Sequence, residues 1–179
     1  MLKSRRYLFL LPVALGMAAL VSPPRVVRDT HPELSLIPFA ATFRSTPFSG
    51  IAFSFHSNGY PRRLRFFWNG KQTGREWSWY RDGKRLAERR FAAGLEHGIQ
   101  RGWYIDGKIR YSKSFHSGEP HGEFWTWHPS GTVALLAKYE SGEEISYRSW
   151  NASGKPFFNY VLRDGERVGL MGETYCDTK

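Results

Sequence analysis

Cysteine and long apolar runs are the scarcest features of this 179-residue sequence. It has one cysteine, Cys176, so an intramolecular disulfide is excluded and any metal site would depend on histidine and carboxylate ligands. Few stretches are continuously apolar, whereas the chain holds 18 Gly, 13 Phe, 9 Tyr and 7 Trp. This composition favours short, half-exposed β-strands over helices. The length suits one domain with a short extra segment.

Acidic residues are also few, with 16 Asp and Glu against 26 Lys and Arg and a formal net charge of +10. The excess is uneven. Residues 60–113 carry 14 basic and 5 acidic residues, whereas residues 114–179 carry 6 basic and 9 acidic ones. This uneven distribution of charge indicates a basic surface that binds phosphate or anionic lipid. The alternative is a basic face that is only solvated.

The N-terminal segment reads as a targeting signal rather than as part of the fold. It contains Lys3, Arg5 and Arg6, and an apolar run follows from Tyr7 to Val21. This is the pattern of a secretory signal, and the run is shorter than the about 20 residues of a full membrane span. We therefore expect residues 1–22 to be a signal peptide or an uncleaved N-terminal membrane anchor. The protein would then be exported to the periplasm or cell surface, or held at the membrane.

The rest of the chain divides into an irregular segment and a regular array. Residues 23–47 hold five prolines without periodicity, and we expect them to form a linker or a lead-in strand. From Gly50 to Gly142, glycines follow one another at steps of 9, 11 and 4 residues, which sum to a repeat of 24. A fifth copy starts at Ser146, is one residue shorter and continues to Gly169. A fixed period of this size is typical of repeat arrays.

Each copy is expected to contain two tight hairpin turns, because its glycines follow residues that favour such turns. One set is Asn58-Gly59, Asp82-Gly83, Asp106-Gly107, Ser130-Gly131 and Ser153-Gly154, and the other is Asn69-Gly70, Ala93-Gly94, Ser117-Gly118, Ser141-Gly142 and Asp164-Gly165. Each copy is expected to hold a first strand of about six residues and a second of about nine. Five copies would form an antiparallel meander about 50 Å long.

Large side chains recur at fixed places in these expected strands. In the first strands, rings alternate with small or polar residues, which places the rings on one face. This aromatic ladder includes Trp77, Trp79, Trp103, Trp125, Trp127 and Trp150. In the second strands, the position three residues before the turn glycine is always large: Phe67, Phe91, Phe115, Tyr139 and Leu162. We expect these columns to stack into a continuous core, with an open aromatic track for a ligand as the alternative.

The stretch HGEFWTWHPSGTVALLAKYESGE, from His121 to Glu143, resembles the bacterial variant of the MORN repeat. The resemblance covers residues 48–169 and implies an all-β fold, an elongated antiparallel meander of about five 24-residue β-hairpin repeats, with residues 170–179 as a C-terminal tail. Proteins of this kind are often labelled antitoxins of a toxin–antitoxin system, the YwqK family, and eukaryotic MORN repeats act as scaffolds linked to membrane lipids. Two positions depart from the pattern, Arg101 in place of the first Trp and Ser146 in place of glycine.

No enzymatic constellation is readable, so no catalytic residue, metal site or cofactor is expected. His97 and His121 occupy equivalent positions in two copies and would lie near 10 Å apart, too far to share one metal ion. His56, His116 and His128 are single histidines on strands or turns. The sequence therefore predicts a non-enzymatic scaffold or binding module of the bacterial cell envelope.

Basic residues are the expected contact surface for a protein or anionic lipid partner, whereas nucleic acid is not expected beside an export signal. They are the column Arg65, Arg89 and Lys113, with Arg62, Arg63, Arg85, Arg90 and Arg110 nearby. The alternative function is a cell-wall carbohydrate-binding module that uses the aromatic ladder for ring stacking and cation–π contact. Edge-to-edge self-association through the end strands is left open.

Overall fold

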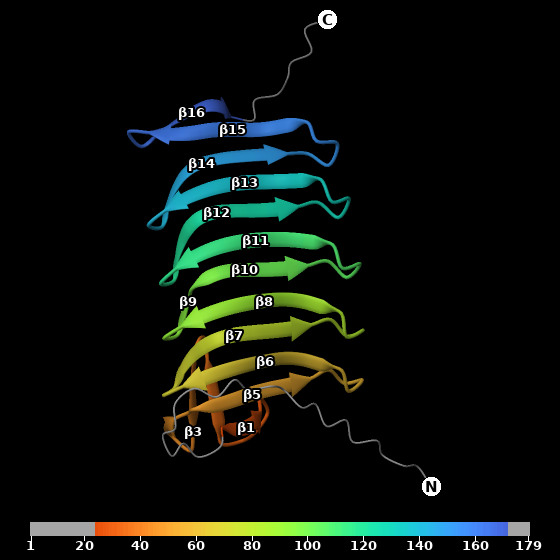
Figure 1. Ribbon diagram of the computed structural model, residues 1–179, viewed down its shortest axis with the longest axis vertical. Helices are drawn as coiled ribbons and strands as arrows, with labels where there is room; N and C mark the ends of the chain where they lie inside the picture. The colour runs from red at the N-terminus through yellow and green to blue at the C-terminus, as the bar shows by residue number, and fades with distance from the viewer. Residues whose placement is uncertain (1–23, 172–179) are drawn as a thin grey trace, which may run out of the picture.

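The computed structural model describes residues 24–171, and within this range the chain forms strands and no helix (Figure 1). Sixteen strands belong to one long open sheet. This confirms the all-β prediction. The expected signal or anchor at residues 1–22 lies outside the described residues, as do residues 172–179 of the expected tail.

Five hairpins follow one another along the sheet, each strand lying antiparallel to the one before it (Figure 1). At about 4.8 Å between neighbours, the twelve strands of the main path extend about 50 Å. The hairpins are β5 (Gly50–Phe55) with β6 (Pro61–Trp68), β7 (Lys71–Trp79) with β8 (Arg85–Ala92), β10 (Gly98–Trp103) with β11 (Ile109–His116), β12 (Glu119–Trp127) with β13 (Val133–Glu140), and β14 (Glu143–Trp150) with β15 (Pro156–Arg163). The two-residue β9 (Leu95–Glu96) pairs with β8, and β16 (Glu166–Met171) closes the series.

Residues 23–47, expected to be a linker or a lead-in strand, contain four short strands that pack on the first hairpins. These are β1 (Arg25–Arg28), β2 (Leu34–Ile37), β3 (Ala40–Phe43) and β4 (Thr46–Pro47). Strand β1 runs parallel to β5, which makes the sheet mixed rather than purely antiparallel. Strand β3 reaches the main sheet at one point, where Ala40 pairs with Lys71 of β7.

The two edges of the sheet carry different turns, as the two sets of glycines predict. At one edge the turn holds three residues: the Tyr80 N–H donates to the Lys84 carbonyl at 2.8 Å, and Gly83 takes a φ of 84°. At the other edge both turn residues are left-handed, for example Ala93 at 51° and Gly94 at 87°, which is the two-residue type I′ hairpin turn. Four of the five type I′ turns also reach back about one copy along the chain. The Gly94 N–H, for example, donates to the Gln72 carbonyl at 2.8 Å.

The predicted length of about six residues is confirmed for two first strands and wrong for the other three. Gly50 opens β5 and Gly98 opens β10, each with six residues. Strands β7 and β12 have nine residues and β14 has eight, because they begin before the glycine position. Strand β7 begins at Lys71, directly after the type I′ turn, and has nine residues, whereas β8 has eight. Gly74 sits in a bulge of β7, where the register opposite β6 shifts by two residues and φ is 70°. The fifth copy has Ser146 in place of that glycine, and its bulge holds one extra residue instead of two. A shorter bulge thus accounts for the missing residue of the fifth copy.

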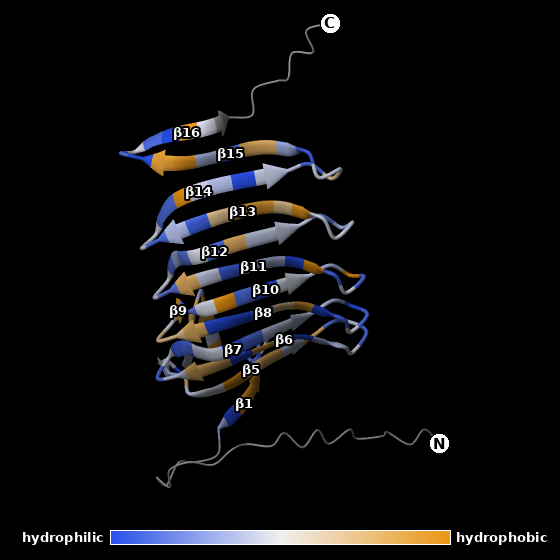
Figure 2. Cartoon of the chain, turned by 45° about the horizontal axis from the view of Figure 1, so that its top comes forward, coloured by the Kyte–Doolittle hydropathy of each residue, from blue (hydrophilic) through white to orange (hydrophobic). Residues whose placement is uncertain are grey.

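The packed core lies at the N-terminal end of the sheet. Strands β2 and β3, together with Phe48 after β4, close over the first hairpin, and β1 pairs at its edge. Phe48 is 1% exposed. The buried cluster is Val27, Leu34, Ala41, Phe48, Ala52 and Phe67, with Leu36 and Phe43 packed against it. Along the rest of the sheet, hydrophobic and hydrophilic residues alternate within the strands (Figure 2).

Candidate functional site

The two aromatic columns face opposite sides of the sheet, which contradicts a single shared core. In the register of β6 with β7, Trp77 pairs with Leu64 and Ser78 with Arg63, so the Trp positions lie on the side opposite Phe67. We name the two sides the tryptophan face (Trp77, Trp79, Trp103, Trp125, Trp127 and Trp150) and the phenylalanine face (Phe67, Phe91, Phe115 and Phe124). Phe67 and Phe91 are buried at 3% and 4% exposure, whereas every Trp of the ladder is half-buried.

One continuous row of large side chains crosses the tryptophan face close to the three-residue turns. Five rings, one from each copy, occupy every second position of this row, about 10 Å apart. In spatial order, and with the partner from each second strand between them, the aromatic row is Phe55, Pro61, Trp79, Arg85, Trp103, Ile109, Trp127, Val133, Trp150 and Pro156. Packed neighbours explain why the four Trp rings of the row are half-buried on a face that β2 to β4 do not cover, whereas Phe55, at the end of the row, is 45% exposed.

Arginines accompany the rings on the tryptophan face. The Arg85 guanidinium lies 5.2 Å from the Trp103 ring centroid, a cation–π distance, and approaches Glu88 at 4.0 Å. The strand register adds further arginines to this face, and all are exposed: Arg75, Arg90, Arg101 and Arg148. This side of the sheet therefore combines aromatic area with positive charge.

A shallow apolar depression of about 430 Å³ lies on the same face, between the last two complete hairpins. Trp125 and Trp150 border it, with Val133 and Leu136 on the strand between and Arg148 beside Trp150. The rings of Trp125 and Trp127 stack at 6.1 Å. The depression is large enough for one ring-sized group to lie against these side chains.

Arg65, the first member of the predicted basic column, is not an exposed contact residue. Its side chain is 9% exposed and forms a 2.9 Å ion pair with Asp29, the residue that follows β1. Its guanidinium also lies 5.7 Å from the Phe67 ring. Because it ties the N-terminal strands to the sheet, Arg65 belongs to the packing of the fold.

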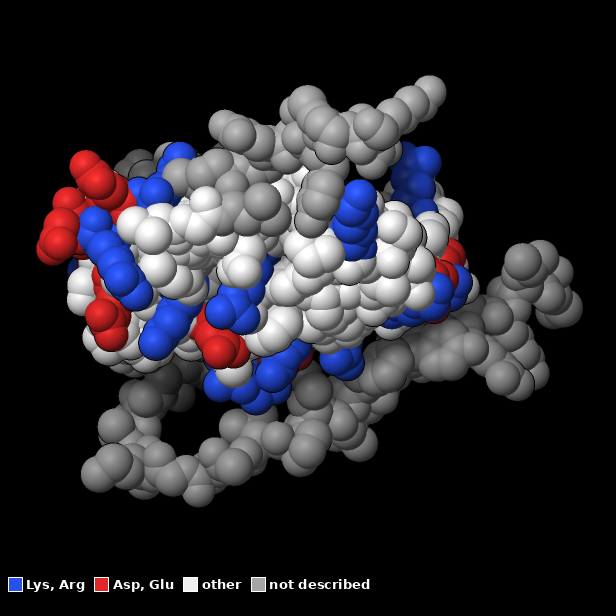
Figure 3. All heavy atoms as spheres, turned by 90° about the horizontal axis from the view of Figure 1, so that it is seen from above, with Lys and Arg blue, Asp and Glu red and all other residues white. Residues whose placement is uncertain are grey.

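The remaining predicted basic residues are divided between the two faces. Arg63, Arg89 and Lys113 share the phenylalanine face, Arg85 and Arg90 lie on the tryptophan face, and Arg62 and Arg110 occupy bulges. Seen from above in Figure 3, acidic side chains gather at the left edge and basic ones are distributed along the molecule. The predicted set therefore does not form one surface.

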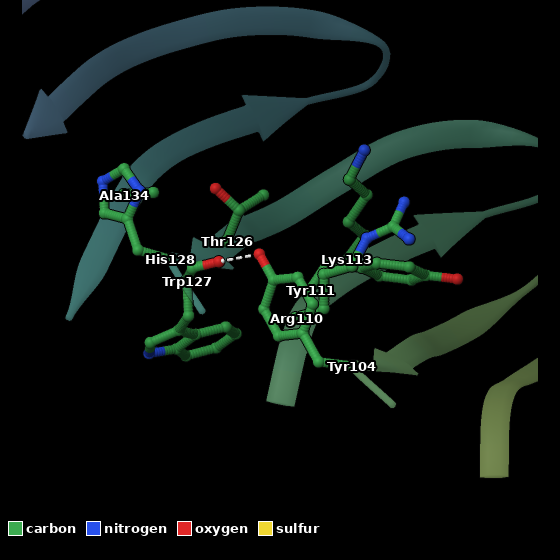
Figure 4. Close-up of a pocket in the computed structure, with 8 residues that line it drawn as sticks. All are labelled: Tyr104, Arg110, Tyr111, Lys113, Thr126, Trp127, His128 and Ala134. Atoms are coloured by element: carbon green, nitrogen blue, oxygen red, sulfur yellow. Dashed lines mark hydrogen bonds between the residues drawn. The ribbon is translucent and has the colours of Figure 1, made fainter. Parts of the chain in front are cut away.

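Two of the predicted residues, Arg110 and Lys113, do meet in a shallow pocket of about 280 Å³ (Figure 4). Both cations lie beside the ring of Tyr111, at 5.8 and 5.9 Å from its centroid. Tyr104 and Thr126 are also at the rim. Two cations and hydroxyl groups suit a small anionic group, such as a carboxylate or a phosphate.

A ladder of side-chain hydrogen bonds joins successive copies, and the sequence reasoning missed it. The residue after each ring of the aromatic row reaches the backbone carbonyl of the next ring. Tyr80 and Tyr104 donate from their hydroxyls to the Trp103 and Trp127 carbonyls at 2.8 and 2.6 Å. The other members are His56 Nε2 to Trp79 O and His128 Nε2 to Trp150 O, both at 2.9 Å. The signal in the sequence was a polar ring at the same position of four consecutive copies.

Acidic groups at the turns and in the last hairpins have shifted pKa values. The backbone N–H of Lys84 donates to the Asp82 carboxylate and lowers its pKa, and Lys108 does the same for Asp106. On the phenylalanine face, burial and a 2.8 Å hydrogen bond to Glu144 raise the pKa of Tyr160 to about 12. The two aspartates stabilise the three-residue turns, and the hydrogen bond from Tyr160 to Glu144 joins β15 to β14.

Comparison with protein families, curated proteins and solved structures found no match to this chain. Among residues 24–171, no helix is long and apolar enough to cross a membrane. Within the same residues, no three His, Cys, Asp or Glu side chains are placed, as they stand, to hold a metal ion.

Proposed function

We propose that this protein is a non-enzymatic binding module of the bacterial cell envelope, built on MORN-like hairpins, with the tryptophan face as its contact surface. The aromatic row is the observation that supports this proposal. Five copies present a ring at the same register position, on the side opposite the N-terminal strands. A row of this length suits an extended surface or a long partner better than a single small molecule.

The chemistry of this face favours an anionic lipid surface. Trp side chains prefer the headgroup level of a membrane, where their apolar rings and polar N–H groups are both accommodated. Each Lys or Arg close to an anionic leaflet contributes about 1 kcal/mol of attraction. The exposed Arg75, Arg85 and Arg101 lie among the rings. The signal or anchor expected at residues 1–22 would deliver the module to a membrane.

Co-sedimentation with vesicles tests this proposal. The chain should pellet with vesicles that contain phosphatidylglycerol and remain in solution with pure phosphatidylcholine, and added salt should weaken the binding. Changing Arg75, Arg85 and Arg101 together to Gln should weaken the binding. The control, Arg63→Gln with Arg89→Gln, changes only the phenylalanine face and should bind as the native chain does. Equal binding to both vesicles, or a loss confined to the control, would contradict the proposal.

Cell-wall carbohydrate is the second candidate partner, favoured by the regular spacing of the rings. A ring recurs at every second strand, and a linear glycan presents sugar faces at a similarly regular interval. Affinity electrophoresis in gels that contain cell-wall polysaccharide distinguishes the two. Retardation that depends on Trp79, Trp103 and Trp127 but not on salt would favour the carbohydrate.

A further inference from the structure

Three histidines lie on neighbouring strands at the type I′ edge of the tryptophan face. His97 directly precedes β10, His116 ends β11, and His121 lies in β12. The 24-residue repeat places only His97 and His121 at equivalent positions, and these two residues are two strands apart. His116 lies between them: its ring centroid is 5.1 Å from that of His97 and 6.0 Å from that of His121. The strand order therefore brings three imidazole rings close together, although the 24-residue repeat does not relate His116 to the other two.

We propose that His97, His116 and His121, the histidine cluster, bind a divalent transition metal ion, with Zn²⁺ as the best match. Zinc holds imidazole nitrogens at about 2.0–2.1 Å in a tetrahedron, which places the centroids of two ligating rings about 5 Å apart. His97 and His116 already have this separation. Imidazole ligands also suit Cu²⁺ and Ni²⁺.

The third ring reaches the ion by side-chain rotation. His97 and His121 are two strands apart, so both outer rings must turn towards His116 before one ion can reach all three. All three rings are exposed, so this rotation meets little steric resistance. The backbone N–H of Ser117 donates to His97 Nδ1 at 3.5 Å, which leaves Nε2 as the metal ligand of that ring. Since the donors do not converge in the ion-free chain, the ion itself draws them together.

Glu119 supplies a fourth donor, a carboxylate oxygen, at the same place. It pairs with His116 in the register of β11 and β12. Together with His116, His121 and Ser141 it borders an open depression of about 300 Å³. Its carboxylate can bind the ion directly or accept the N–H of a ligating imidazole, which orients that ring. The depression leaves room for water on the ion.

Within residues 24–171, the cluster occurs in a part of the sheet that no other strand covers. Thr73 stands at the equivalent position of the second copy, so the site is particular to the third and fourth copies. An ion held there would join β10, β11 and β12 across two hairpins. This role does not depend on the partner of the tryptophan face.

Isothermal titration of the tag-free chain with ZnCl₂, in a Cys176→Ser background that removes the thiolate, tests the site. We expect one ion per chain. His116→Ala removes the central ring and should weaken the binding about tenfold or more, and His116→Gln should do the same. His31→Ala, a histidine near β2, is the matched control and should leave the binding unchanged. Circular dichroism of each variant verifies that the sheet is retained.

Proton NMR of the histidine rings gives a second, residue-level result. On addition of Zn²⁺, the ring signals of His97, His116 and His121 should shift together at one equivalent, whereas those of His31 should not. Absence of saturable binding in the native chain would overturn the proposal. So would binding that survives His116→Ala in a folded protein, or ring shifts confined to other histidines.

Discussion

The two ends of this sheet are built from the same repeat but are held together differently. At the N-terminal end, β2 to β4 cover the phenylalanine face, and Phe48, Ala52 and Phe67 are exposed by 3% or less. In the third to fifth copies the sheet is a single layer within residues 24–171, and Phe115 and Tyr139 are only half-buried at equivalent positions. Equivalent residues in a repeat array are therefore not energetically equivalent, because a covering layer, and not the repeat, completes the burial.

The uncovered copies depend on contacts within each hairpin and on contacts between neighbouring copies. Phe124 packs against Tyr139 at 4.6 Å, and Tyr147 stacks on Tyr160 at 5.5 Å. The hydroxyl of Tyr104 joins the third copy to the fourth. In such an array the stability is close to a sum of unit and nearest-neighbour terms, so the uncovered end should open at lower cost than the covered end.

Deleting whole or half copies in the uncovered region should have the largest effect. Deletion of residues 98–121 joins His97 to Gly122 and keeps strand direction, faces and turns, so the shortened chain should fold cooperatively with reduced stability. Deletion of residues 98–109 removes one strand and reverses every strand that follows, so this chain should misfold or aggregate. Circular dichroism and thermal melting compare the two. Similar behaviour of both deletions would show that the 24-residue copy is not the unit of folding.

Aromatic truncation on the phenylalanine face should separate the covered end from the uncovered end. Phe67→Ala removes a ring that is only 3% exposed and should lower the free energy of unfolding by about 3–5 kcal/mol. Phe115→Ala removes a half-buried ring that contacts Phe124, and it should cost about 1–2 kcal/mol. Urea unfolding of both variants measures the difference. Equal losses would remove the distinction between the two ends.

The sequence predicted the features that depend on residues close together in the chain. It did not predict the contacts between residues that are far apart in the chain. Glycine spacing and turn residues were sufficient for the all-β class and the hairpin series. The bulge at Gly74 was misread as a strand end, because a left-handed glycine serves a turn and a bulge equally well. The burial of Arg65 depends on Asp29, 36 residues earlier, and the histidine cluster depends on cross-strand register. The periodicity of the sequence predicts neither the burial of Arg65 nor the histidine cluster.

Replacing Arg65 should distinguish its packing role from that of an exposed arginine. Arg65→Gln leaves the part-buried Asp29 carboxylate without its charged partner, and the free energy of unfolding should fall by about 2 kcal/mol. Arg85→Gln on the tryptophan face should change it by no more than about 0.5 kcal/mol. Chemical denaturation gives both values. If Arg65→Gln left the free energy of unfolding unchanged, Arg65 would not have the packing role assigned to it.

Removing one rung of the hydrogen-bond ladder should have a smaller effect. Tyr104→Phe deletes the hydroxyl that donates to the Trp127 carbonyl and should cost about 1 kcal/mol. Tyr60→Phe alters an exposed ring close to the same edge and should cost less. Thermal melts of the pair provide the comparison, and equal melting temperatures would mean that the ladder does not support the uncovered copies.

Alkaline pH should produce the smallest change, confined to the last hairpins. Tyr160 has a folded pKa of about 12, above its usual value of 10, so its contribution to stability is complete below pH 10 and is lost as the pH rises towards 12. Tyr160→Phe should remove this part of the pH dependence. Unfolding curves between about pH 9 and about pH 12 would show the same pH dependence of stability in both proteins if the hydrogen bond to Glu144 were unimportant.

Hydrogen exchange of backbone amides, followed by mass spectrometry on the native chain, tests the difference between the two ends most directly. Amides of β5 to β7, beneath the covering strands, should exchange most slowly, and protection should fall through β10 to β16 as the sheet becomes a single layer. Uniform protection along the array, or the strongest protection in β14 to β16, would contradict this account.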